Sequence, residues 1–294
     1  MASTTSSGDR VVSGSPDVQH SDYLLSRLWF QSQQLMDRPQ EGFPALVFHC
    51  RDMQSLHRVH FYQPTLLLVL KGAKRIESPY DAICPQGNLL LIAQGSEFPF
   101  SNIPDDVYTA LVICFQPDDF PFAGPADHTP ELDIVQACNN VLTVIEQMMS
   151  LADLPADNPD IRALLWQQRR RELAQILTVL NQDKVLRVTD NPGWKQKLAD
   201  LLQTDLSSTW QINEVCQMLA ISESSLRRRL KEENTGFREL LEDLRLTHGL
   251  GLLQTTQWPV NQVALSCGYQ SASRFSERFR KRFRISPAEL RKAR

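Results

Sequence analysis

The chain lacks the features that mark several large classes of protein. Its 294 residues contain no apolar run long enough to cross a membrane, and the first twenty, rich in Ser, Thr and Gly, lack the apolar block of a signal peptide. The six cysteines form neither a Cys-x-x-Cys pair nor a zinc-finger spacing. We therefore expect a cytoplasmic protein without membrane contact. Its cysteines should be reduced and buried, the alternative being a redox sensor or an occasional disulfide.

Signs of catalysis and of a bound metal are also scarce. The sequence shows no nucleotide-binding glycine loop, no nucleophile elbow and no Ser/His/Asp order. His49, His57 and His60 could suggest a metal, but the His-x-His followed by Glu of metal-binding barrels is missing. Because successive residues of a strand face opposite sides, His57 and His60 would also point apart. We expect no metal, no cofactor and no enzymatic activity.

Charge is unevenly distributed along the chain. The net charge is -3, yet residues 194–294 hold 17 Lys and Arg against 11 Asp and Glu, while residues 1–193 hold 14 against 23. A basic C-terminal part suits contact with phosphates. The acidic N-terminal part argues against nucleic-acid binding along the whole chain.

Two helix-turn-helix patterns follow one another in the basic part, at 212–230 and 260–279. In each, an apolar helix closes on a turn, and a serine, Ser222 or Ser271, offers its hydroxyl as N-cap to a second helix. That helix has apolar residues on one side and polar or basic residues on the other. Such a pair of helices can read the major groove of DNA.

The segment 210–291 resembles the DNA-binding domain of AraC/XylS-type transcription regulators, chiefly in 268–276 (GYQSASRFS) and 285–291 (ISPAELR). The resemblance covers about a third of the chain. It implies a regulator that binds promoter DNA, more often an activator than a repressor, with RNA polymerase as a further partner. It also implies a homodimer and an N-terminal domain that senses a small-molecule effector or mediates dimerisation.

The outward faces of the two second helices supply the residues expected to meet DNA. In the second unit Phe275 and Phe279 lie on the core side, so Arg274 is placed to donate to guanine and Glu277 to accept from cytosine. For Glu277, where many relatives have arginine, an i,i+4 pair with Lys281 is the alternative. The predicted DNA-binding residues are Ser224, Ser225, Arg227, Arg228, Arg229 and Lys231 in the first unit, and Ser273, Arg274, Ser276, Glu277, Lys281 and Arg282 in the second.

Several of the basic residues are expected to contact the DNA backbone rather than the bases. They are Arg229 and Lys231 in the first unit, and Arg278, Arg280, Lys281, Arg282 and Arg284 in the second. Between the units, 237–253 reads as one helix, roughly 25 Å long at a rise of ~1.5 Å per residue. It could hold the reading helices about one turn of DNA apart, near ~34 Å. Gly249 within it falls where relatives commonly have alanine, which suggests close helix packing.

The N-terminal part reads as a β-domain with helices. Residues 1–20 are predicted to be a disordered tail, and a helix follows at 21–38. Apolar runs of strand length then occur at 45–48, 65–70, 88–92 and 109–115, separated by turn signals. This spacing indicates a sandwich or barrel, and the domain resembles the cupin-like barrel of AraC-type regulators, partly through 71–75 (KGAKR). The predicted fold class is therefore α+β: a cupin-like sensor and dimerisation domain at 21–189, then an all-α DNA-binding domain at 190–294.

A helical part is expected at about 131–182 of the N-terminal domain. An apolar stripe there contains Ile134, Val141, Ile145 and Met148 at intervals of three, four and seven residues. Two interpretations stay open: the stripe packs on the β-domain, or it forms a dimer seam as in relatives. A linker is predicted at 190–193 (DNPG).

Three functions compete at this stage. The first is a sequence-specific regulator with an effector-sensing or dimerisation domain. The second is a protein-gated regulator, or a repressor, with no small-molecule ligand. The third, a barrel enzyme with an appended DNA-binding module, would need a catalytic or metal cluster within residues 40–125, and the sequence shows none.

Overall fold

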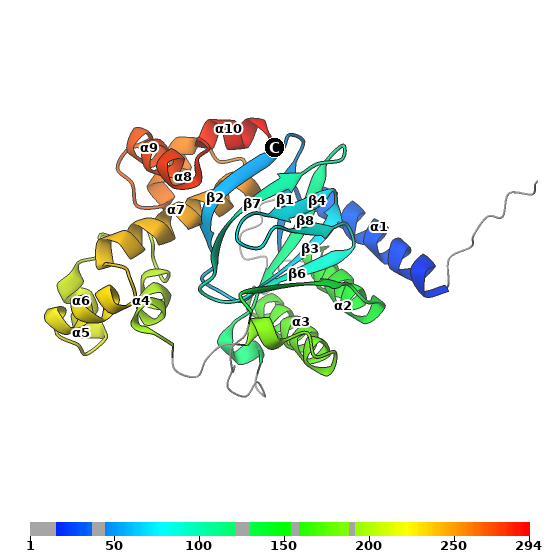
Figure 1. Cartoon of the computed structure of the whole chain (residues 1–294), viewed down its shortest axis with the longest axis horizontal. Helices are drawn as coiled ribbons and strands as arrows, with labels where there is room; N and C mark the ends of the chain where they lie inside the picture. The colour runs from blue at the N-terminus through cyan, green and yellow to red at the C-terminus, as the bar shows by residue number, and fades with distance from the viewer. Residues whose placement is uncertain (1–15, 37–44, 121–129, 154–158, 188–191) are drawn as a thin grey trace, which may run out of the picture.

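A computed structural model describes residues 16–36, 45–120, 130–153, 159–187 and 192–294 (Figure 1). It contains an N-terminal domain of β-strands with helices and a C-terminal domain of helices alone, which confirms the predicted fold class. Within these ranges no helix combines the length and apolar character needed to span a bilayer. Two of the four residues of the predicted linker, 190 and 191, lie outside the described ranges, and the first helix of the C-terminal domain begins at Trp194.

The β-domain consists of two antiparallel sheets rather than one closed barrel, an arrangement compatible with a cupin-like jelly roll. The larger sheet has the order β1 (Ala45–Cys50), β8 (Tyr108–Cys114), β3 (Thr65–Lys71), β6 (Asn88–Ile92) and β9 (Leu132–Gln136). The smaller has the order β2 (Gln54–His60), β7 (Glu97–Ile103), β4 (Ala73–Ile76) and β5 (Ala82–Pro85).

The larger sheet is buried on both faces. Leu66 and Leu68 of β3 pack in a cluster with the N-terminal helices, whereas Leu67 and Val69 belong to a cluster with the smaller sheet. A strand buried on both sides needs no polar alternation, and this explains the unbroken apolar runs of the sequence. The four predicted runs correspond to β1, β3, β6 and β8.

Three helices cover the outer face of the larger sheet, on the side away from the C-terminal helices (Figure 1). They are α1 (Pro16–Met36), α2 (Asn139–Ser150) and α3 (Pro159–Val179). Because α1 already begins at Pro16, the prediction of a disordered tail is wrong for residues 16–20. Residues 1–15 lie outside the described ranges. The prediction of a helix from about 131 is also wrong, since Ile134 lies on strand β9, paired with Leu90 of β6.

The predicted dimer seam is wrong for the three of its four residues that lie on α2. Val141, Ile145 and Met148 of α2 are each 0% exposed within a single chain. They belong to the core cluster that joins α1, α2 and α3 to the larger sheet. Since their surface is already covered by the same chain, the alternative interpretation, packing on the β-domain, is the one that the structure supports.

The C-terminal domain contains two helix-turn-helix units and a long connecting helix. Its helices are α4 (Trp194–Leu202), α5 (Ile212–Met218), α6 (Glu223–Glu232), α7 (Phe237–Thr255), α8 (Val260–Ser266), α9 (Ala272–Phe283) and α10 (Pro287–Lys292). The units are α5–α6 and α8–α9. The connecting helix α7 has 19 residues, two more than predicted. Its length is therefore about 28 Å.

The two units repeat the same local geometry. Ser222 Oγ accepts from the backbone N–H of Ser225, and Ser271 Oγ accepts from that of Arg274, each at 3.3 Å, so both predicted N-caps are confirmed. The turns before them need a left-handed residue, which is Ala220 (φ 51°) in the first unit and Gly268 (φ 74°) in the second. A Cβ on Gly268 would also lie 2.7 Å from the carbonyl oxygen of Leu206, so only glycine fits there.

Gly249 lets α7 and α9 approach each other. A Cβ at this position would lie 2.7 Å from Cε2 of Phe275 and 3.2 Å from Sγ of Cys267. The expected reason for this glycine, close helix packing, is thus confirmed. The aromatic core of the second unit continues from Phe275 to Phe279 and Phe283. The rings of Phe275 and Phe279 are tilted at a centroid distance of 5.5 Å, and those of Phe279 and Phe283 meet edge to face at 4.7 Å.

Candidate DNA interface and the contact between the domains

The outward face of α9 is polar and open to solvent. Ser273, Arg274, Glu277 and Lys281 are exposed and Ser276 is half-buried. The opposite face, formed by the three phenylalanines, is fully buried. The structure therefore places the predicted base-reading residues on the accessible side. No ion pair joins Glu277 to Lys281 among the described residues, so the carboxylate of Glu277 is available to a base.

The outward face of α6 is similar but carries ion pairs of its own. Arg227 Nη2 lies 2.6 Å from Glu223 Oε1, and Arg228 Nη1 lies 2.8 Å from Glu232 Oε1. All four side chains are about half exposed or more. Such surface pairs contribute only about 0–1 kcal/mol, so both arginines can exchange these partners for DNA. The side chains of Ser224 and Lys231 are exposed as well.

Two other predicted contact residues of the first unit already have partners within the protein. The Ser225 hydroxyl accepts from Ser222 Oγ at 2.9 Å and so belongs to the N-cap. The guanidinium of the half-buried Arg229 lies 4.7 Å from the ring centroid of Trp194, a cation–π contact with α4. Arg229 thus fixes α4 against α6, and only its exposed part can reach a phosphate.

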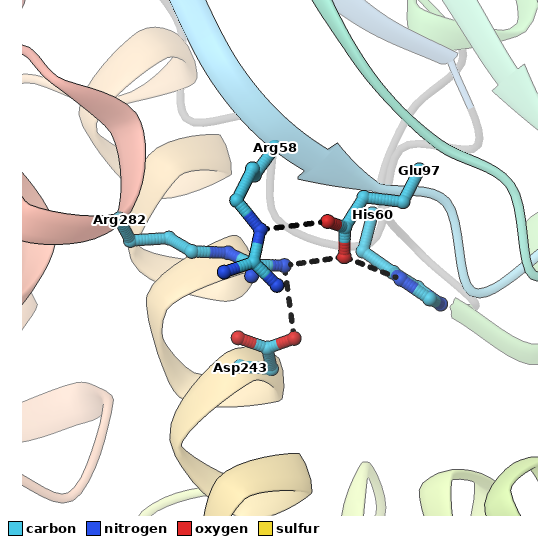
Figure 2. Close-up of polar contacts among 5 residues, drawn as sticks. All are labelled: Arg58, His60, Glu97, Asp243 and Arg282. Carbon is cyan, nitrogen blue, oxygen red and sulfur yellow. Dashed lines mark hydrogen bonds and ion pairs between the residues drawn. The ribbon is translucent and has the colours of Figure 1, made fainter. Parts of the chain in front are cut away.

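Arg282 does not lie at the DNA interface, and its prediction as a phosphate contact is wrong for this structure. Its side chain is 7% exposed, and Nη2 lies 2.9 Å from Glu97 Oε2 of β7 and 2.9 Å from Asp243 Oδ2 of α7. Figure 2 shows this guanidinium entering from α9 between the two carboxylates. The physical reason is helix periodicity. Arg282 follows Phe275 by seven residues and Phe279 by three, so it shares their inward face.

A small ionic cluster therefore joins the two domains. Glu97 also pairs with Arg58 of β2 at 2.8 Å, and His60 Nδ1 lies 3.4 Å from its Oε2 (Figure 2). Burial alone would raise the pKa of Glu97, but hydrogen bonds from His60 and Arg58 and the charge of Arg282 hold it far below its usual range. Burial raises the pKa of Asp243, although the positive charge of Arg282 acts in the opposite direction. Burial lowers the pKa of His60. The cluster favours ionised Glu97 and neutral His60.

The histidines are separated as predicted: His57 is exposed and His60 is buried. The sequence did not indicate that His60, Glu97 and Asp243 would meet, with potential ligand atoms within 4.8 Å of one another. Arg58 and Arg282 already supply positive charge to both carboxylates there. The group is therefore an ionic contact between domains.

Hydrogen bonds extend the contact between the domains. The backbone N–H groups of Arg51 and Asp52 donate to the carbonyl oxygen of Ala293 at 2.7 and 3.2 Å. Gln196 Nε2 of α4 donates to the carbonyl oxygen of Tyr62 at 3.2 Å. Both halves of the C-terminal domain thus contact the β-domain.

A cavity of about 730 Å³ lies between the two domains. Its β-domain wall includes Phe48, Leu67, Lys74 and Phe100, and its C-terminal wall includes Leu244, Thr247 and Leu250 of α7. The lining is mostly apolar, as is typical of small-molecule sites. The sequence did not predict this cavity, because residues distant in the chain form it.

Known proteins resemble the chain most clearly in its C-terminal part. A family model described as a helix-turn-helix domain matches residues 215–293. The HTH-type transcriptional regulator YdeO of Escherichia coli K12 is 36% identical over 96 residues, which are 33% of this chain and 38% of YdeO. The HTH-type transcriptional regulator GadX of the same strain is 24% identical over 160 residues, 53% of this chain and 57% of GadX. The chain thus matches these curated relatives over less than two thirds of their length.

A solved structure resembles both domains. ToxT from Vibrio cholerae, crystallised with an unsaturated fatty acid bound, matches with a TM-score of 0.58 at 17% identity, over 85% of this chain and 94% of ToxT. At this identity the likeness shows the fold alone.

The tandem units and these matches assign the C-terminal domain to the helix-turn-helix class. The resemblance read from the sequence is confirmed: the C-terminal domain belongs to the AraC/XylS family of transcription regulators.

Proposed function

We propose that the protein is a sequence-specific transcription regulator whose β-domain controls how the two helix-turn-helix units meet promoter DNA. The observation that carries this proposal is the pair of capped helices, α6 and α9, each with a basic, exposed outer face and a buried inner face. Arg274 is exposed near the N-terminus of α9, where recognition helices contact base edges. Arg227 and Arg228 have the corresponding role on α6.

The spacing of the units supports binding by a single chain to two successive segments of the major groove. Helix α7 spans about 28 Å. With the width of the two units added, this suits reading helices about one turn of DNA apart, near ~34 Å. Such a chain recognises a bipartite site, with Arg274 selecting guanine in one half.

Regulation acts through the contact between the domains. The ionic cluster at Arg282 and the cavity beside α7 both involve side chains of the DNA-binding domain, so a molecule in the cavity would touch the helix that spaces the two units. ToxT, which has a similar fold, was crystallised with an unsaturated fatty acid bound, and this supports a small-molecule ligand for the present chain. We propose a small-molecule effector here, in preference to gating by a protein partner.

The remaining features follow from the family resemblance. The protein acts in the cytoplasm as a binding protein rather than an enzyme, and as an activator that contacts RNA polymerase. It forms a homodimer, for which α3 offers Leu164 and Val179, 52% and 82% exposed, in place of the buried stripe on α2. Sedimentation of Leu164→Asp tests this assignment. A monomeric, folded variant supports it, and an unchanged dimer contradicts it.

The experiment that tests the main proposal is a salt titration of DNA binding. The full chain and the segment 190–294 are each titrated against a promoter fragment and against a scrambled fragment of equal length. We expect log K to fall linearly with log[salt], by ~0.9 per neutralised phosphate, and the promoter fragment to bind about 1,000-fold more tightly or better. Equal affinity for both fragments would contradict sequence-specific recognition.

A further inference from the structure

Arg245 of α7 lies where the apolar core of the C-terminal domain divides in two. Leu244 and the buried leucines before it on α7 belong to the cluster that contains Leu226 of the first unit. Leu246 and the buried leucines after it belong to the cluster that contains Phe275 of the second unit. Each unit thus has its own apolar core, and a contact at the border of the two cores influences how the units are oriented to each other.

The side chain of Arg245 touches both units. Its Nε donates to the carbonyl oxygen of Leu206 at 3.0 Å, and its Nη2 donates to that of Ser208 at 2.7 Å. Both carbonyls belong to the segment between α4 and α5, which leads into the first unit. The same guanidinium lies against the turn of the second unit, since a Cβ on Gly268 would be 2.6 Å from Nη2. One side chain therefore connects the start of one unit with the turn of the other.

The donors of Arg245 are used on backbone carbonyls rather than on an acid. Among the described residues no carboxylate forms an ion pair with it, and Asp205 acts on it only through its charge at longer range. A guanidinium holds its N–H groups in one plane, so two bonds to carbonyls two residues apart fix both the position and the direction of that segment.

The segment that Arg245 holds is braced by its own hydrogen bonds. Asp205 Oδ1 accepts from the backbone N–H and the hydroxyl of Ser207 at 2.9 and 2.6 Å, and Oδ2 accepts from the hydroxyl of Ser208 at 2.6 Å. The carbonyl oxygen of Asp205 accepts from Trp210 Nε1 at 2.7 Å, and Trp210 packs against the core of the first unit. The position of the Arg245 contact is therefore passed on to the first unit.

Two glycines weaken α7 on the side of Arg245 that leads to the second unit. Gly249 is required by its contact with Phe275, but a Cβ on Gly251 would meet no atom within 4 Å, so packing does not require this glycine. A glycine within a helix costs ~1 kcal/mol relative to alanine and widens the range of backbone angles. Bending at these positions would turn the second unit relative to the first. The contact between Arg245 and Gly268 bridges this weak point.

We propose that Arg245 is a positioning residue that sets the spacing and rotation between the two halves of the DNA site that the chain selects. This inference rests on the proposed function and deepens it. Each base pair inserted between the halves moves the second half by ~3.4 Å and rotates it by about 35°. Units that are held rigidly cannot follow this rotation, whereas units joined by a bending α7 can.

Binding of the full chain to sites of different spacing tests the proposal. A bipartite site that the chain selects is compared with versions that have one or two base pairs inserted or removed between the halves, and with a single half. We expect a change of one base pair to weaken the original chain by about ten-fold or more, and Arg245→Met by only about two-fold. Both chains should bind the single half equally, because the hydrogen bonds of Arg245 go to the protein backbone. The same spacing preference in both chains would overturn the inference.

Two further arginine variants separate geometry from charge. Arg245→Lys keeps the charge but not the planar pair of donors, so its spacing preference should lie between those of the original chain and Arg245→Met. Arg238→Met removes the same charge from an exposed position on α7 and should leave the spacing preference unchanged. If Arg238→Met relaxed the preference as much as Arg245→Met, loss of charge would be the cause and the assignment would be wrong.

Variants that keep Arg245 test the account even if Arg245→Met fails to fold. Asp205→Ala removes an exposed side chain that braces the segment held by Arg245, and should relax the spacing preference by several-fold. Gly251→Ala stiffens α7 without a clash, and should restore part of the preference when added to Asp205→Ala or to Arg245→Met. A spacing preference that neither change alters would contradict the proposal.

A measurement without DNA separates this inference from the proposed function. Spin labels are attached at Ser224→Cys and Ser273→Cys, both exposed, in a full chain whose two half-buried cysteines, Cys114 and Cys138, are replaced by alanine. We expect a narrow distribution of distances between the labels, and a clearly broader one after Arg245→Met. Equally narrow distributions would overturn the inference. Failure of the chain to bind any DNA would overturn the proposed function, while the label distances would still decide whether Arg245 fixes the units.

Discussion

Replacing Arg282 by methionine should separate the roles of two arginines that lie two residues apart on α9. Arg282 is 7% exposed and pairs with Glu97 and Asp243, which are 29% and 20% exposed. Losing one member of a fully buried pair costs about 3–5 kcal/mol. An exposed pair contributes about 0–1 kcal/mol. Because both acids keep some contact with water and Glu97 retains Arg58, we expect a loss of about 2 kcal/mol from the contact between the domains.

Arg280→Met is the matched control, because Arg280 is exposed on the same helix. Amide hydrogen exchange along β2 and β7 should be faster in the Arg282 variant than in the original chain, whereas the control should exchange at the original rate. In DNA titrations the control should lower the salt slope by ~0.9, the loss of one phosphate contact, while the Arg282 variant should leave the slope unchanged. If Arg282→Met lowered the salt slope by this amount and left hydrogen exchange unchanged, Arg282 would contact DNA and the assignment to the domain contact would be wrong.

Further predictions address the reading helix, the turns and the buried lysine. Arg274→Ala should weaken binding to the cognate site by about 1–3 kcal/mol and relax selection at a single base pair, as measured on a library of sites. Ala220→Gly should raise the free energy of unfolding by roughly 0.5–1 kcal/mol in urea titrations, since glycine adopts its left-handed φ without strain. Gly249→Ala should lower it by ~1–3 kcal/mol, because its Cβ would lie 2.7 Å from Cε2 of Phe275. Since burial lowers the pKa of Lys74 to about 7, the folded chain should gain stability as pH rises from about 7 toward the pKa of a free lysine near 10.4, and Lys74→Met should abolish that rise.

The sequence revealed most clearly the elements with local signals. The serine caps and the alternation of Phe275 and Phe279 with polar residues located both reading helices. All four predicted strand runs fall in the larger sheet, which is apolar throughout because helices cover one face and the smaller sheet covers the other. The strands of the smaller sheet were missed, since residues such as Ser55, His57 and Arg58 leave too little apolar character to detect.

The wrong predictions for Ile134 and Arg282 both came from reading the spacing of apolar residues incorrectly. Ile134 fitted a helical stripe by spacing alone, although it belongs to a strand that ends just before α2. The same spacing argument, applied to α9, would have placed Arg282 on the inward face with Phe275 and Phe279. The contacts between the domains, from Glu97 to Arg282 and from Gln54 to Leu290, join residues about 185 and 236 positions apart, so no local pattern indicates them.

Selection of genomic DNA fragments by the full chain in vitro, followed by sequencing of the retained DNA, tests the central claim most directly. We predict strong enrichment of a few promoter fragments that share a bipartite motif with its halves about one turn of DNA apart, and loss of one conserved base pair from that motif when Arg274→Ala is used. Retention of all fragments in proportion to their length, with no shared motif, would contradict the assignment of this chain as a sequence-specific regulator.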